Sequence, residues 1–145
     1  MTSSILGTWR LLSWYNELSD GSRTYPLGEE AKGFISYSPD GYVFVQMMAA
    51  GRKLYRINDP FGGSLEEDAA AIKSQISYSG SYFERDNQVV HIVEAATCPN
   101  WVGTQQIRNV AFSGSNLLLS AEGAKFQGQT VTAFVLWEKA SAKPN

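Results

Sequence analysis

The chain has 145 residues, of which 43% are hydrophobic, and its 12 basic and 14 acidic residues leave a formal net charge of -2 at pH 7. This length and apolar content suit a single globular domain, residues 1–145, with a core of its own. Because Lys and Arg form no cluster and no stretch approaches the length of a membrane span, neither nucleic acid nor a membrane is expected as a partner.

The first strand is expected at residues 7–18. A glycine that allows a tight entry into the strand is followed two positions later by Trp9, whose indole can close one end of a barrel. Strict alternation puts Trp9 and Tyr15 on one face, and Leu12 and Trp14 on the other. Both faces of this strand therefore carry large apolar groups.

Alternation of apolar and polar residues predicts seven further strands, at residues 33–37, 42–48, 76–85, 89–96, 104–112, 117–121 and 130–138. Ser64 followed by Glu67 forms a capping box, which predicts a helix over residues 64–75. The pattern indicates an all-β fold, an eight-stranded antiparallel up-and-down barrel with one short helix between strands three and four. A barrel of this size encloses room for one small ligand.

Several short motifs lie in a fixed order along nearly the whole chain. They are GTWRLLS at 7–13, YPLG at 25–28, GFISYSPDGY at 33–42, YSGSY at 78–82, VVHIV at 89–93, PNWVGT at 99–104 and LWEK at 136–139. This series resembles the lipocalin-like domain family of bacterial and fungal proteins. The resemblance implies a lipocalin-like barrel without a metal or organic cofactor, and some barrels of this kind isomerise or cyclise lipophilic natural products.

Polar side chains on the strands are the candidates for catalysis, because a polar group inside a barrel needs a partner, a water or a ligand. His91, the only histidine, suits acid or base chemistry near neutrality. Arg108 can stabilise a developing oxyanion, with Gln106 and Tyr82 beside it. The alternatives are a hydrogen-bonded core position for His91 and a barrel-end position over Trp9 for Arg108.

A second group of residues consists of aromatic and amide side chains that are candidates for ligand contact. They are Gln46, Phe44, Tyr78, Tyr37, Trp101 and Tyr15. Trp101 lies in a loop between residues that break strands, where it can cap a planar ligand, whereas strand tyrosines serve packing equally well.

The only cysteine, Cys98, precedes a proline and has no histidine or acid at a nucleophile-like spacing, so an inert thiol is expected. It cannot form a disulfide within the chain, and no secretory signal is evident, so we expect a cytoplasmic protein. With one histidine and no metal-ligand spacing, no metal site is expected.

Three functional hypotheses follow. The first is a cofactor-free isomerase, cyclase or dehydratase that acts on a lipophilic oxygenated small molecule, as in secondary metabolism. The second is a non-catalytic intracellular carrier of such a molecule. The third is a barrel filled by its own aromatic residues that serves assembly, with Leu12 and Trp14 in the interface of a homodimer.

Overall fold

Residues 4–141 are described by a computed structural model, in which nine strands and two short helices follow one another. In chain order they are β1 (Gly7–Glu17), β2 (Arg23–Thr24), β3 (Lys32–Tyr37), β4 (Tyr42–Met48), α1 (Leu65–Lys73), β5 (Gln75–Arg85), β6 (Gln88–Ala96), η1 (Pro99–Trp101), β7 (Gln105–Ser113), β8 (Asn116–Phe126) and β9 (Gln129–Lys139). Neither helix in these residues has the length and hydrophobicity needed to cross a lipid bilayer.

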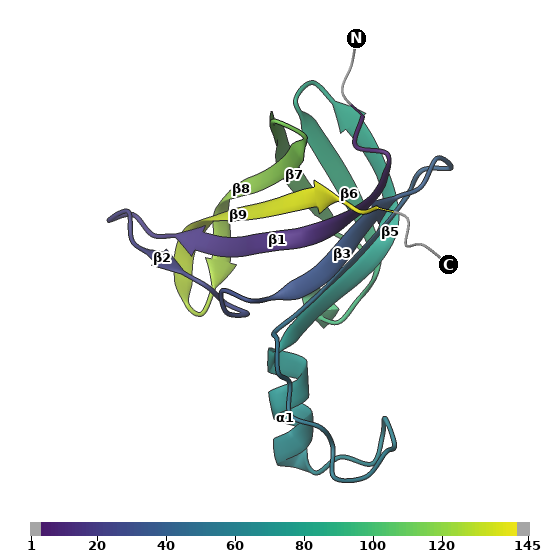
Figure 1. Cartoon of the computed structure of the whole chain (residues 1–145), viewed down its shortest axis with the longest axis vertical. Coiled ribbons are helices and arrows are strands. Elements are labelled where there is room, and N and C mark those ends of the chain that lie inside the picture. Colours follow the sequence, from purple (N-terminus) through teal and green to yellow (C-terminus); the bar gives the residue numbers. More distant parts are fainter. Residues whose placement is uncertain (1–3, 142–145) are drawn as a thin grey trace.

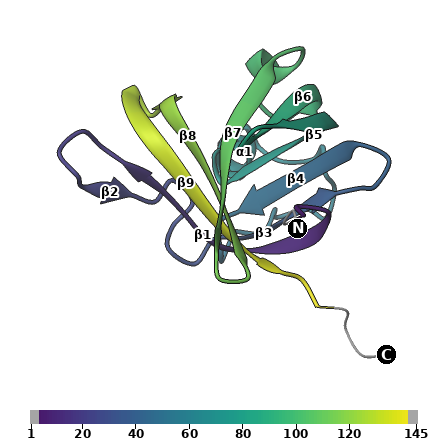
Figure 2. The same ribbon diagram turned by 90° about the horizontal axis from the view of Figure 1, so that it is seen from above.

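Hydrogen bonds between successive strands close the sheet into a barrel. Each strand from β3 to β8 pairs antiparallel with the next, and β1 pairs with both β3 and β9, as Figures 1 and 2 show. Within residues 4–141, eight long strands thus form the wall, and the two-residue β2 pairs with the end of β1. Closure pairs the strands that would otherwise be edges. The predicted all-β barrel is confirmed, with α1 between the third and fourth wall strands.

A bulge in β1 decides which of its side chains face the interior. The register with β9 shifts between Leu11 and Ser13, which places one extra residue in β1. Leu11 is buried before the bulge, and Trp14 and Asn16 are buried after it. The strict alternation expected from the sequence is therefore wrong beyond residue 11, since Trp14 faces the interior and Tyr15 the outside.

Residues 49–74, which we call the arm, leave the barrel between β4 and β5 and carry α1 (Figure 1). The predicted capping box is present: the Ser64 hydroxyl accepts a bond from the Glu67 N–H at 3.1 Å, and the Glu67 carboxylate accepts one from the Ser64 N–H at 2.9 Å. These bonds satisfy backbone donors at the helix start. No residue of α1 is buried, so this helix adds little to the core.

Gly80 in β5 occupies a position where only a hydrogen atom fits. A Cβ atom there would overlap the backbone carbonyl oxygen of Ile92 on β6, beside a register shift at Ser79. Because the backbone of a closed barrel yields little, we expect Gly80→Ala to lower the free energy of unfolding by about 3 kcal/mol. The control, Ser79→Ala, should change it by less than about 1 kcal/mol. Urea unfolding followed by circular dichroism measures both, and equal stability of the two variants would contradict this prediction.

Candidate functional site

The interior of the barrel contains a cavity of about 50 Å³. All eight wall strands contribute side chains to its lining, most of them apolar. The lining residues whose side chains carry nitrogen or oxygen atoms are Tyr78, His91, Arg108 and the tryptophans Trp14, Trp101 and Trp137. The site is therefore an apolar space with a few polar groups, the usual composition of a small-molecule pocket.

His91 is held between two tyrosines in the barrel wall. Its side chain is 1% exposed. The Tyr37 hydroxyl lies 2.7 Å from Nε2, and the Tyr78 hydroxyl lies 2.6 Å from Nδ1. Both ring nitrogens thus have partners, and the three side chains form a continuous Tyr37–His91–Tyr78 chain across β3, β6 and β5.

Burial keeps the three hydrogen-bonded side chains Tyr37, His91 and Tyr78 uncharged. It lowers the pKa of His91 to about 3, with the positive charge of Arg108 as a smaller cause, and it raises the pKa of Tyr37 and Tyr78 above the ordinary value. A neutral imidazole has one N–H donor and one acceptor nitrogen, so one tyrosine donates to His91 and the other accepts from it. When Nδ1 carries the proton, Tyr78 accepts that bond, and its own hydroxyl proton is available to an acceptor in the cavity.

Arg108 lines the cavity from β7 and is oriented by its own strand. It donates to the Gln106 side-chain oxygen at 2.9 Å and to the Ile107 carbonyl at 3.0 Å, both uncharged acceptors. Arg108 and Gln106 therefore share a face, as the sequence predicts. The barrel-end alternative is wrong, because the cation over the Trp9 ring is Lys139, with Nζ 4.7 Å from the centroid.

Trp137 adds a polar atom that the sequence interpretation did not select. Its indole Nε1 is buried and has no hydrogen-bond partner within the part of the chain that the structure describes. A buried donor without a partner costs about 1–3 kcal/mol, so an acceptor supplied by a ligand would be favourable there. The signal in the sequence was its position two residues after Val135 on the inward face of β9.

Two other predicted site residues, Tyr82 and Trp101, lie next to the tyrosines that bond to His91. The Tyr82 hydroxyl donates to the Ser38 carbonyl at 3.0 Å, and its ring meets Tyr37 edge-on with centroids 4.9 Å apart. Tyr82 therefore supports Tyr37, and it does not line the cavity. Trp101, in η1, lines the cavity and meets the Tyr78 ring edge-on at 5.7 Å.

Three predicted ligand contacts lie outside the barrel instead. In β4 the inward positions are taken by aliphatic side chains, so Phe44 and Gln46 point outward, and Phe44 is exposed. The bulge in β1 turns Tyr15 outward, where its ring stacks on Phe134 at 5.2 Å and lies beneath the Arg23 guanidinium. The expectation that these three side chains converge on the cavity is wrong.

The described residues 4–141 contain no group of three or more His, Cys, Asp or Glu side chains that could hold a metal ion. Cys98 is half-buried, and it immediately precedes η1. His91 has both ring nitrogens bonded to tyrosines, so it does not bond to this sulfur. For a bound molecule, the residues that line the cavity offer hydrogen-bonding groups and the positive charge of Arg108.

A closed antiparallel barrel with a partly polar interior cavity is the architecture of lipocalin-type proteins. The sequence profile of the lipocalin-like domain matches residues 6–140, and the chain belongs to this family. The resemblance stated from the sequence motifs is confirmed.

Individual relatives extend this comparison. The chain is 31% identical over 103 residues to the 4'-hydroxy-3'-methoxypropiophenone carrier protein ppsC of Aspergillus oryzae, a match that covers 65% of this chain and 93% of that protein. Among solved structures it is similar to a lipocalin-like protein of Bacteroides uniformis (14% identity, 94% and 98% of the two chains, TM-score 0.48). A protein of Bacteroides eggerthii is also similar (12% identity, 93% and 99%, TM-score 0.46).

The low pKa of His91 makes the stability of the fold depend on pH. Between its ordinary value of 6.5 and the folded value of about 3, the unfolded chain binds more protons. The contribution of His91 to the free energy of unfolding is therefore fully present above pH 6.5. It decreases toward pH 3 by about 1.4 kcal/mol per pH unit. His91→Gln, which does not titrate, should show a shallower loss in urea unfolding between about pH 7 and 4. Parallel pH profiles for the two proteins would exclude His91 as the cause.

Proposed function

We propose that this protein binds a small, largely apolar molecule with oxygen substituents inside its barrel. The observation that carries the proposal is the buried indole N–H of Trp137, which has no partner within residues 4–141; Trp137 lines an apolar cavity together with Tyr78 and Arg108. A few placed donors in an apolar wall suit a ligand whose oxygen atoms must be oriented. Membership of the lipocalin-like domain family supports small-molecule binding.

The name of the Aspergillus oryzae relative suggests the chemical class of the ligand. It names a propiophenone with a hydroxyl and a methoxy group, and therefore an aromatic ring with a ketone and a phenol. In our proposal the ligand of this chain is an aryl ketone of similar size. Its ketone oxygen accepts from Trp137 Nε1, and its phenolic oxygen lies toward Tyr78 and Arg108.

The cavity must widen to take such a molecule, because about 50 Å³ is well below the roughly 300–1,000 Å³ of typical ligand pockets. Trp101 is the side chain best placed to make room. It is half-buried, and η1, which carries it, is only three residues long. Rotation of its indole away from Tyr78 would enlarge the cavity on the side of η1.

Binding without chemistry, the carrier hypothesis, agrees better with the site than acid–base catalysis by His91. A pKa of about 3 keeps the imidazole neutral at physiological pH and makes it a weak base. Its two hydrogen bonds also leave neither nitrogen free for a substrate. His91 then orients the Tyr78 hydroxyl, and isomerisation, cyclisation or dehydration is the less favoured proposal.

Removing the free indole N–H tests this function directly. We expect wild type to bind 4'-hydroxy-3'-methoxypropiophenone in isothermal titration calorimetry, and Trp137→Phe to weaken this binding about fivefold, the value of one neutral hydrogen bond. For an analogue in which a methylene group replaces the ketone, the two proteins should bind equally. An equal loss for both ligands would show that Trp137 contributes only packing.

Two controls accompany this measurement. Phe44→Ser, on the outer face, should leave the affinity unchanged, and an effect there would argue against an interior site. Mass spectrometry of the ketone after incubation should show it unaltered. A product that wild type forms and His91→Gln does not form would favour the enzyme hypothesis over the carrier.

A further inference from the structure

The arm has a defined shape because hydrogen bonds tie its loop to one side of α1. Arg52 donates to the Ser74 hydroxyl at 2.9 Å and to the Ala71 carbonyl at 3.0 Å. The Tyr55 hydroxyl donates to Asp68 at 2.8 Å, which fixes the loop near the first turn of the helix. These bonds hold the loop against α1.

The arm exposes large apolar side chains. Leu65, Ala69 and Ile72 are spaced i, i+4 and i+7 on α1, which places them in one stripe, and Leu65 is 90% exposed. Phe61 and Leu54 in the loop are 97% and 86% exposed. A stripe of this kind on an ordered helix normally packs against something, and exposed apolar patches often mark contacts between proteins.

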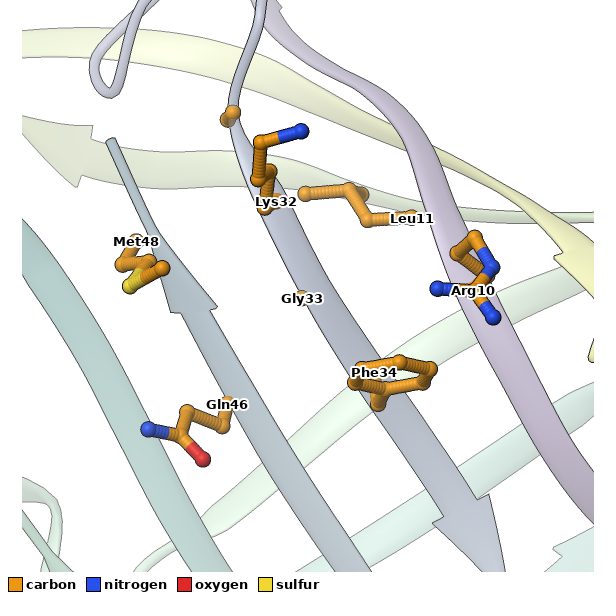
Figure 3. Close-up of a pocket in the computed structure, with 8 residues that line it drawn as sticks. Arg10, Leu11, Lys32, Gly33, Phe34, Gln46 and Met48 are labelled. Carbon is orange, nitrogen blue, oxygen red and sulfur yellow. The ribbon is translucent and has the colours of Figure 1, made fainter. Parts of the chain in front are cut away.

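A pocket of about 360 Å³ lies on the outer face of β1, β3 and β4 (Figure 3). Strand register aligns Arg10, Phe34 and Gln46 in one row across the three strands, and Lys32 and Met48 in the next. We call this site the outer pocket; it is lined by the outward side chains of Arg10, Lys32, Phe34, Gln46 and Met48, together with the buried residues Leu11 and Ala31. It combines an apolar surface with two cations and no acid.

The outer pocket and the arm are complementary in polarity and charge. Phe61 and Leu65 supply apolar groups for the pocket, and Glu66, exposed beside Leu65, supplies a negative charge for its cations. Arg10 lies over the Phe34 ring at 4.8 Å and has Glu138 opposite it on β9. Lys32 instead faces the uncharged Met48, so Lys32 is the better partner for Glu66.

We propose that two copies of this chain form a two-fold dimer in which the arm of each lies in the outer pocket of the other. Met48 lines the pocket and is the last residue before the arm, so pocket and arm adjoin on one copy. A two-fold axis beside Met48 then carries each arm across to its partner, and the contact closes at two copies. The proposal does not depend on the ligand of the barrel.

Sedimentation velocity of the full chain tests the dimer. Wild type should sediment as a dimer, and Leu65→Glu should raise the dissociation constant at least tenfold. The control is Val102→Glu, the same charge change at an exposed apolar residue outside both the arm and the outer pocket, which should remain dimeric. A monomeric wild type, or a Leu65→Glu variant as dimeric as the control, would overturn the proposal. Circular dichroism verifies that each variant is folded.

An exchange of charges tests whether the arm meets the outer pocket. Lys32→Glu and Glu66→Lys should each weaken the dimer, and the double variant should recover most of the wild-type affinity. If the arm variants are monomeric but Lys32→Glu has no effect, or if the double variant is no better than the single ones, the arms pair in another way. Either result would refute this docking.

Discussion

The pairing of β1 with both β3 and β9 is the constraint on which the rest of the structure depends. It turns a sheet into a barrel, so that side chains from all eight wall strands meet in one interior. The bulge after Leu11 belongs to this pairing, and it turns Trp14 and Asn16 toward the core. Closure encloses the inward face around the cavity and leaves the outward face on the surface.

The interior combines neutral hydrogen-bonding groups with apolar walls. Burial holds Tyr37, His91 and Tyr78 in uncharged forms, and their mutual hydrogen bonds offset the cost of removing them from water. Trp137 is the exception, since its N–H has no partner among residues 4–141. In the proposed function, these groups recognise the ligand by its oxygen atoms.

The outer face of the same strands has a different character. In β3 and β4, the inward Ile35 and Val45 belong to the core, while the outward Phe34 and Gln46 line the outer pocket. Alternation thus lets one pair of strands serve both the cavity and the outside. The arm adds an apolar stripe on α1 that the barrel does not cover. In the proposed dimer, the second copy of the chain covers this stripe.

Local patterns in the sequence determined the order of strands, the capping box at Ser64 and the family, because alternation, turn residues and caps act over a few neighbouring residues. They did not determine which face of β4 points inward, since Phe44 and Val45 are both apolar. Only the tertiary structure decided that, together with the bulge in β1 and the contacts of His91 to tyrosines 54 and 13 residues away. Period two shows which residues share a face, but register and closure select the face that is buried.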